Sequence, residues 1–241
     1  DLFIAFGGLN PKNWRVTSGG AGFHHMHQHV QAAYDSGTQF VVISPVADDI
    51  PSGIEARWIA PRPGTDTAIM VGLCHELLQR GRADKDFLKR YCAGSEALLA
   101  YLYGEEDNIV KSLTWAAEIA DVPVVLLSEL AGRCMTGRVM LSASWSLQRA
   151  HHGEQTYWTL IALAAMLGQI GLPGGGFTFG YGSLNAVGEH ARKGLVPHLP
   201  VLGNKGGSSI PVARVADMLE YPGKTLRFNG RKITFPDTRL I

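Results

Sequence analysis

The sequence predicts an α/β fold in which a mainly parallel sheet carries helices on both of its faces. Three observations support this class. Short apolar runs without polar alternation recur along the chain, as is typical of strands buried on both sides. Longer segments with apolar residues at helical spacing separate these runs. Glycine and proline stand at the ends of both kinds of segment, where the chain must turn.

The predicted strands and helices alternate along the chain up to about residue 176. Four apolar runs are predicted to be strands: 2–6, 39–44, 57–60 and 138–143. Helices are predicted over residues 23–36, 67–80, 84–91, 95–102, 112–120, 123–133 and 155–168. Such alternation is typical of a Rossmann-like, mainly parallel sheet with helices on both faces.

The pattern weakens after Gly176. The next thirty or so residues are rich in Gly, Ser and Asn and show no clear period. A short helix over 212–219 and a β-hairpin with a type I′ turn at Asn229-Gly230 are predicted beyond them. We therefore expect an α/β ligand-binding domain, residues 1–176, and an irregular extension, residues 177–241. The chain begins directly on a strand pattern, so we expect it to be a segment of a longer protein.

Composition narrows the class of protein. The 46% hydrophobic and 18% charged residues allow a substantial core. The 22 basic and 21 acidic residues nearly cancel, which argues against a nucleic-acid partner held by bulk charge. No apolar run is long enough to span a membrane. The three cysteines are far apart and form no C-x-x-C pair, so buried free thiols are expected rather than a disulfide or metal site.

The loops that follow the predicted strands hold the candidate binding residues. In a parallel sheet these loops share one edge, and ligands bind there. No G-x-G-x-x-G follows the first strand, so ordinary nicotinamide binding is weakly supported. Taken loop by loop, the candidates are Lys12 and Asn13; Ser44, Pro45 and Asp48; Gly64, Thr65 and Asp66; and Trp145, Arg149, His152 and Gln155.

Several of these residues also have a plain structural interpretation. Asp48 and Asp66 can hydrogen-bond a ribose or the N–H edge of a guanine. Spacing alone, however, favours Asp66 as a cap or first-turn acid of the helix that follows it. A lone lysine such as Lys12 is more often solvated than bound to phosphate, and Ser44-Pro45 can simply end a strand.

The run HHMHQH, residues 24–29, suggests zinc, because histidines four residues apart share a helix face. The run contains no Glu and shows no third ligand, so a partly exposed helix start is favoured over a metal site. One of His151 and His152 is expected to face a ligand. The absence of G-x-S-x-G leaves a serine hydrolase with little support.

One stretch resembles a known family. WSLQRAHHGEQ, followed by MLGQIGLPGGGF, is similar to the molybdopterin oxidoreductases of the dimethyl sulfoxide reductase family, in the branch of trimethylamine N-oxide, dimethyl sulfoxide and biotin sulfoxide reductases. Supporting matches are FGGLNPKN, VVISPVADD, APRPGTDTAIMVGL and, near the end, IPVARVADMLEYPGKTLRFNGRKITFPD. The resemblance covers nearly the whole chain. Leu9-Asn10-Pro11 departs from the Asp-Pro that usually precedes the lysine in this branch.

The resemblance implies a central fragment of a reductase that acts on S-oxides or N-oxides by oxygen-atom transfer. It implies molybdenum bis(molybdopterin guanine dinucleotide) as cofactor, with this chain holding one of the two dinucleotides. Lys12 would reach the pterin, the loop of Ser44 to Asp48 the nucleotide, and the loop of Gly64 to Asp66 the guanine. Trp145 and Arg149 would contact the cofactor near the active site, with weaker matches at His152 and Gln155.

The resemblance also places functions outside this chain. The residue that ligates molybdenum would precede it, so no catalytic residue and no metal ligand is expected here. An electron donor such as a cytochrome or a reductase, and the remaining domains of the parent chain, are the expected partners, in a periplasmic or a cytoplasmic location. The alternatives are a non-catalytic nucleotide- or partner-binding α/β module and a zinc protein built on residues 24–29.

Overall fold

The computed structural model describes residues 1–16, 24–181 and 209–238. The chain divides into two compact units, Asp1–Arg192 and Lys193–Ile241, and each is described by itself. The first unit contains the sheet and the pocket discussed below, while the second contains a helix and a hairpin. None of the helices in the described ranges is both long and apolar enough to cross a membrane.

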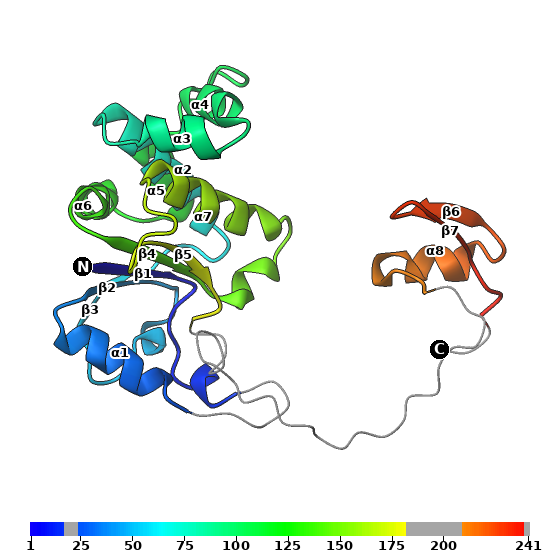
Figure 1. The fold of residues 1–241 in the computed structure, drawn as a ribbon, viewed down its shortest axis with the longest axis horizontal. Coiled ribbons are helices and arrows are strands. Elements are labelled where there is room, and N and C mark those ends of the chain that lie inside the picture. Colours follow the sequence, from blue (N-terminus) through cyan, green and yellow to red (C-terminus); the bar gives the residue numbers. More distant parts are fainter. Residues whose placement is uncertain (17–23, 182–208, 239–241) are drawn as a thin grey trace. The chain divides into compact units, whose positions relative to one another are not determined.

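A five-stranded parallel sheet forms the centre of the first unit (Figure 1). Its strands are β1 Leu2–Phe6, β2 Gln39–Ile43, β3 Ala56–Ile59, β4 Val139–Ala143 and β5 Gly176–Phe179, in the order β3-β2-β1-β4-β5. The predicted α/β class and the four predicted strands are confirmed. The connection from β1 leads to β2 on one side of β1, and the connection from β3 leads to β4 on the other side. The strand order therefore reverses between β1 and β4.

Strand β5 was not predicted. It begins at Gly176, so residues 177–179 extend the sheet beyond the predicted end of the α/β domain at residue 176. Its four residues, GFTF, follow a proline and two glycines and are mostly half-buried at the sheet edge. A segment this short gives neither an apolar run nor a clear alternation. The division of the chain into two parts at this residue stays a prediction.

Helices cover both faces of the sheet (Figure 1). Helix α1 Met26–Asp35 lies on one face. Helices α2 Asp66–Gln79, α5 Leu113–Ala120, α6 Val124–Cys134 and α7 Glu154–Met166 lie on the other. Two shorter helices, α3 Lys85–Tyr91 and α4 Ser95–Tyr103, pack farther out against α7 and α2. All seven helices were predicted within a few residues of these bounds.

Alternate residues of the central strands enter two separate cores. Ile4 and Phe6 of β1 join Val41 and Ile43 of β2 in the larger core under α2, α5, α6 and α7. Residues between them, such as Ala5 and Val42, join the smaller core with Leu9, Trp14, Met26 and Phe40. Because successive side chains of a strand point to opposite faces, both cores can form only if nearly every strand residue is apolar. This explains the apolar runs in the sequence.

The second unit has a short helix and a hairpin, as predicted. A 3-10 turn, Val212–Arg214, leads into α8 Val215–Glu220, and β6 Thr225–Phe228 pairs antiparallel with β7 Arg231–Thr234. Asn229 and Gly230 have φ angles of 47° and 76°. Positive φ at both central residues is the type I′ geometry that suits a two-residue hairpin.

Candidate functional site

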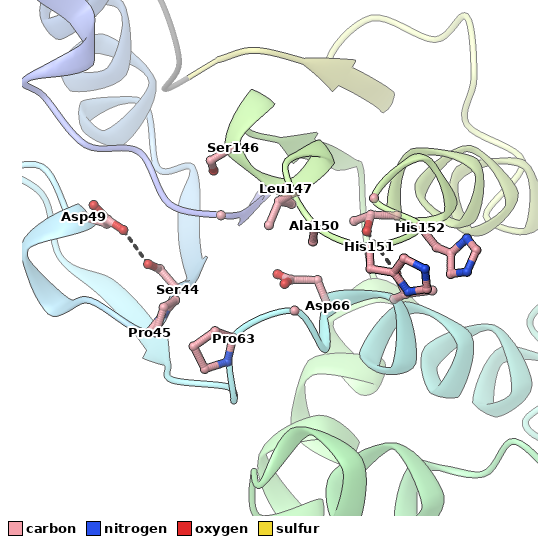
Figure 2. A pocket seen from close by; sticks show the side chains of 15 residues that line it. Ser44, Pro45, Asp49, Pro63, Asp66, Ser146, Leu147, Ala150, His151 and His152 are labelled. Atoms are coloured by element: carbon pink, nitrogen blue, oxygen red, sulfur yellow. Dashed lines mark hydrogen bonds between the residues drawn. The ribbon is translucent and has the colours of Figure 1, made fainter. Parts of the chain in front are cut away.

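A pocket of about 250 Å³ lies at the carboxyl edge of the parallel sheet (Figure 2). Each of the loops that follow β1, β2, β3 and β4 contributes to its wall. The lining residues are Gly7; Ser44, Pro45 and Asp49; Pro63, Gly64, Asp66 and Thr67; and Ser146, Leu147, Ala150, His151, His152, Gly153 and Thr156. The predicted convergence of the four loops at one edge is therefore confirmed. The pocket lies next to the reversal of strand order between β1 and β4, where open α/β sheets bind ligands.

Gly7 brings the first and fourth loops into contact at this point. Its φ is 78°, and a Cβ built on it would overlap the Oγ of Ser144, the residue that follows β4. The Ser144 N–H donates to the Phe6 carbonyl, which continues the pairing of β1 and β4 by one step. A side chain at position 7 would push the two loops apart, so glycine is required for the pocket wall.

The loop after β2 is held by hydrogen bonds around Ser44. The Ser44 hydroxyl donates to Asp49 Oδ2 and accepts from the Val46 N–H at 3.2 Å. Its carbonyl accepts from the indole N–H of Trp58, on β3, at 2.8 Å. Figure 2 shows Ser44, Pro45 and Asp49 together along one wall. This wall presents a carboxylate and a hydroxyl to the pocket.

Asp66 is the buried acid of the site. It is the first residue of α2, it is only 6% exposed, and Figure 2 shows its carboxylate pointing into the pocket. Burial raises its pKa to about 6, an effect opposed by the hydrogen bond with its own backbone N–H. No described basic side chain pairs with this carboxylate. Asp66 is thus a first-turn acid, as its spacing predicts, and it also faces the pocket.

Two helix N-termini meet at the pocket. Helix α2 begins at Asp66 and α7 at Glu154, and the hydroxyls of Thr67 and Thr156 lie 3.0 Å apart between them. The first turns of helices leave N–H groups without helical partners and carry a partial positive charge. This end of the pocket suits an anionic group such as a phosphate.

The turn before α7 brings two imidazoles to the pocket. His152 has a φ of 55°, which is uncommon for a residue with a side chain, and its ring lies 3.9 Å from the ring of His151 between centroids. A Cβ on Gly153 would overlap the Gln148 carbonyl, so only glycine allows the turn to close. Both imidazoles are exposed and line the pocket. That one of these two histidines faces a bound ligand stays a prediction.

The structure brings some of the predicted binding residues to the pocket and leaves others beside it. Ser44, Pro45, Gly64, Asp66 and His152 line it. The remaining candidates lie on the same loops but outside the pocket lining. Lys12 and Asn13 lie in an exposed turn after β1, and Arg149 is exposed after β4. Asp48 lies on the exposed side of its loop, and the Thr65 hydroxyl donates to the Arg62 carbonyl at 2.6 Å.

Trp145 and Gln155 line other hollows. Trp145 borders a shallow one with Gln148, Tyr157 and Phe179. Gln155 borders an apolar groove between α4 and α7. Sequence reasoning did not select the pocket residues Asp49, Thr67, Ser146 and Thr156, and it named His151 only as an alternative to His152. Each stands within two residues of a selected position, so the sequence located the loops but not the side chains that turn inward.

The histidine run does not form a metal centre in the described ranges. Helix α1 begins within it, at Met26, and the rings of His25 and His29 lie 6.2 Å apart between centroids. His24 Nδ1 is 3.3 Å from the Trp14 carbonyl. Across residues 1–16, 24–181 and 209–238, no group of three or more His, Cys, Asp or Glu side chains is placed to hold a metal ion.

The fold and the pocket define an α/β domain with a cavity at the carboxyl edge of its parallel sheet. Comparison with known proteins gives its family: the sequence model of the molybdopterin oxidoreductase family matches residues 1–228. The chain belongs to this family, as the resemblance in its motifs predicts.

Named relatives lie within one branch of the family. The chain is 44% identical to a biotin sulfoxide reductase of Cereibacter sphaeroides, over 99% of this chain and 32% of that protein. It is 42% identical to a dimethyl sulfoxide/trimethylamine N-oxide reductase of the same organism, over 90% of this chain and 28% of the relative. Trimethylamine-N-oxide reductase 1 of Escherichia coli K12 is 40% identical over 76% and 23% of the two chains. The chain thus spans about a third or less of the length of these curated relatives.

A solved structure shares the fold. The acetylene hydratase of Pelobacter acetylenicus superposes with a TM-score of 0.55 at 19% sequence identity, covering 72% of this chain and 22% of that one. At this identity the likeness supports the α/β architecture of the first unit and carries no argument about chemistry.

Proposed function

We propose that this chain is the part of a molybdenum-dependent S-oxide or N-oxide reductase that binds one molybdopterin guanine dinucleotide of the bis(molybdopterin guanine dinucleotide) cofactor. The observation that carries the proposal is the pocket at the strand-order reversal, where a buried carboxylate and two helix N-termini face one space. The names of the relatives supply the class of reaction and substrate.

The pocket fits the guanosine end of such a cofactor. Guanine offers two adjacent donors, N1–H and N2–H₂, and an ionised carboxylate can accept from both. Asp66 is buried with no described cation beside it, so it lacks the partner that such a base would supply. A volume of about 250 Å³ is slightly below the usual range for small-molecule pockets, which runs from roughly 300 Å³ upward. It therefore suits a nucleoside better than a whole dinucleotide.

The rest of the dinucleotide would extend along the same sheet edge. We assign the phosphates to the helix N-termini and to the backbone of Gly64. Gly64 has a positive φ, and the space where a Cβ would stand is open. His152 lies at this end of the pocket. Ser44, Pro45 and Asp48 would flank the ribose, and Thr65 the base.

The pterin would lie beyond the pocket, near the exposed cations and the indole of the first and fourth loops. Lys12 and Asn13 follow β1, and Trp145 and Arg149 follow β4, the two strands that are paired at the centre of the sheet. A guanidinium donates in a planar fork that matches phosphate or pterin oxygens. Gln155 completes the proposed set from the first turn of α7.

When bound, the cofactor supplies the oxygen-atom transfer and the redox chemistry, while this chain positions it and tunes its surroundings. The substrate proposed for the parent protein is an S-oxide or an N-oxide. Its proposed partners are an electron donor, such as a cytochrome or a reductase, and the domains that complete the cofactor site.

Metal and nucleotide analysis of the full-length protein tests the proposal. We expect molybdenum, and GMP released by acid hydrolysis, in a fixed ratio to polypeptide. Asp66→Ala should lower both contents, whereas Asp35→Ala, a change on the exposed side of α1, should lower neither. Protein purified without molybdenum and without GMP would contradict the proposal. GMP without molybdenum would instead favour a nucleotide-binding module.

A further inference from the structure

One acidic side chain connects two of the loops that form the pocket. Asp49 ends the short 3-10 turn after β2, and it is half-buried at the pocket wall. Its backbone carbonyl accepts from the Leu9 N–H at 3.0 Å, which ties the loop after β1 to the loop after β2. Sequence reasoning selected its neighbour Asp48, which is fully on the exposed side and does not line the pocket.

The two carboxylate oxygens of Asp49 serve different loops. Oδ2 accepts from the hydroxyl of Ser44, on its own loop. Oδ1 accepts from the side-chain amide of Asn10, on the loop after β1, at 2.8 Å. The carbonyl oxygen of the same Asn10 amide accepts from the Lys12 N–H at 2.9 Å. A continuous series of hydrogen bonds therefore runs from Ser44 through Asp49 and Asn10 to the backbone of Lys12.

The fit around Asp49 is close. A Cβ built on Gly8 would lie 2.6 Å from the Asp49 Cβ and 2.8 Å from its Oδ2, and Gly8 has a φ of 84°. Glycine at position 8 leaves the room in which the carboxylate reaches both partners. Ser44 is held by a further hydrogen bond, because the indole N–H of Trp58 donates to its carbonyl at 2.8 Å.

We infer that Asp49 is a positioning residue of the cofactor site: through Ser44 and Asn10 it sets the relative placement of the two loops that carry Ser44 and Lys12. The inference rests on the proposed function, since those two residues are proposed cofactor contacts. It assigns to Asp49 a role that acts through other residues rather than through its own charge on the ligand.

The hydrogen-bond roles make a discriminating substitution possible. In Asp49→Asn the new amide can still accept from Ser44, but it turns an NH₂ toward the NH₂ of Asn10. Flipping the Asn10 amide relieves this but loses the bond from the Lys12 N–H. Flipping the new amide instead makes Ser44 accept from it, and the Ser44 O–H then loses its acceptor. Each arrangement leaves one donor of the series without an acceptor. Exchanging the two residues, Asn10→Asp with Asp49→Asn, restores every bond, because the new carboxylate accepts from both Lys12 and position 49.

The test uses GDP as the probe and calorimetric titration of the full-length apoprotein. We expect Asp49→Asn to raise the Kd for GDP about tenfold, as the loss of one charge-assisted hydrogen bond implies. The matched control Asp35→Asn, at an exposed acid of α1 outside the proposed site, should change it by less than about twofold. The exchange variant should return to within about threefold of wild type. Thermal unfolding of each variant verifies that it is folded.

The outcomes separate this inference from the proposed function. Equal Kd values for Asp49→Asn and wild type would overturn the positioning role. So would an exchange variant as weak as Asp49→Asn, since the effect would then belong to the charge at position 49 itself. The same holds if the control Asp35→Asn weakens GDP binding as much as Asp49→Asn does. Asp66→Ala is titrated in parallel: if it binds GDP like wild type, or if wild type does not bind, the proposed function fails and the positioning role with it.

Discussion

At the scale of single residues, two buried charges show the difference between a group that the fold satisfies and one that it leaves for a ligand. Lys111 is 2% exposed, and its ammonium group donates to Asp107 at 2.7 Å and to the Ile109 carbonyl and lies 4.6 Å from the centre of the Tyr101 ring. Asp66 is almost as buried, yet its pKa is raised because desolvation dominates. A buried charge without a partner is a common mark of a binding site.

The first prediction concerns stability. The pKa of Asp66 is raised from 3.8 to about 6, so the folded state binds a proton more tightly than the unfolded state. The contribution of Asp66 to the unfolding free energy is therefore greatest below pH 4. It falls as the pH rises toward 6, by on the order of 3 kcal/mol. We expect Asp66→Asn to stabilise the ligand-free protein at pH 7 by about 2 kcal/mol, since the lost helix-dipole contact offsets part of the gain.

Urea unfolding at pH 4, 5, 6 and 7 measures this effect. The difference in unfolding free energy between Asp66→Asn and wild type should grow with pH across that window. A constant difference would mean that the carboxylate titrates normally. Gly132→Ala, a change in α6 that removes no titratable group, serves as the control and should show no such growth.

The second prediction concerns ligand binding and pH. A protonated carboxyl group has lost one of its accepting sites and its charge, so it cannot receive both donors of guanine equally well. With a pKa near 6 in the empty site, the affinity for GDP should fall by up to about tenfold for each pH unit below 6. Titrations in Asp66→Asn should lose this dependence. A wild-type profile that is flat between pH 5 and 7 would exclude Asp66 as the acceptor.

At the scale of elements, close helix packing explains why one helix interior contains a glycine. Gly72 stands in the middle of α2, and a Cβ there would lie 2.6 Å from the Cβ of Ala116 on α5. The two helices approach each other over these small residues, and Asp66 is the first residue of α2. The position of the buried acid thus depends on the packing of the helix behind it.

Alanine substitutions at two helical glycines make a matched pair that tests this packing. Gly72→Ala should destabilise the protein by about 1–3 kcal/mol, because the added methyl overpacks the contact between α2 and α5. Gly132→Ala, in α6, meets only an Arg80 nitrogen at 3.7 Å and should stabilise by about 0.5–1 kcal/mol through helix propensity. Urea denaturation measures both. Equal stabilities for the two variants would show that α2 and α5 are not in tight contact.

The elements themselves were largely predictable from the sequence, for physical reasons that differ from case to case. Strands such as Leu2–Phe6 are buried on both faces, so their apolar runs are unmistakable. The hairpin is predicted by Asn229-Gly230, because this pair readily takes the positive φ angles that a two-residue type I′ turn requires. Strand β5 was missed because it is held by pairing with β4 along the sheet edge, and this long-range pairing leaves little trace in a segment of four residues.

At the scale of the whole molecule, the topology decides which loops meet, and the loops decide only roughly which side chains enter the site. The parallel order of the strands brought Gly7, Ser44, Asp66 and His152 to one pocket, as the strand pattern predicts. Single-residue detail was not predictable: Asp48 and Asp49 are equivalent in the sequence, and only the 3-10 turn of their loop determines which of them faces inward.

The last prediction concerns ligand specificity in the intact protein. GDP at one hundred times its Kd should stabilise the folded protein by about 2.7 kcal/mol, because it binds only the folded state. For a chain of 241 residues that is an increase in Tm of several degrees, and the increase is smaller for a longer chain. ADP lacks the paired donors of guanine and should give a much smaller increase. Thermal unfolding measures both, and Asp66→Ala should abolish the difference. Equal shifts for the two nucleotides would contradict guanine recognition.

The pocket wall is drawn from segments as far apart in the chain as Gly7 and Thr156. The complete wall therefore requires β4 and α7 to be in place. The folded protein buries the Asp66 carboxyl group whether or not a ligand is bound. Under the proposed function, a ligand that donates to this group would offset its desolvation, so occupancy of the site and stability of the fold would be thermodynamically linked.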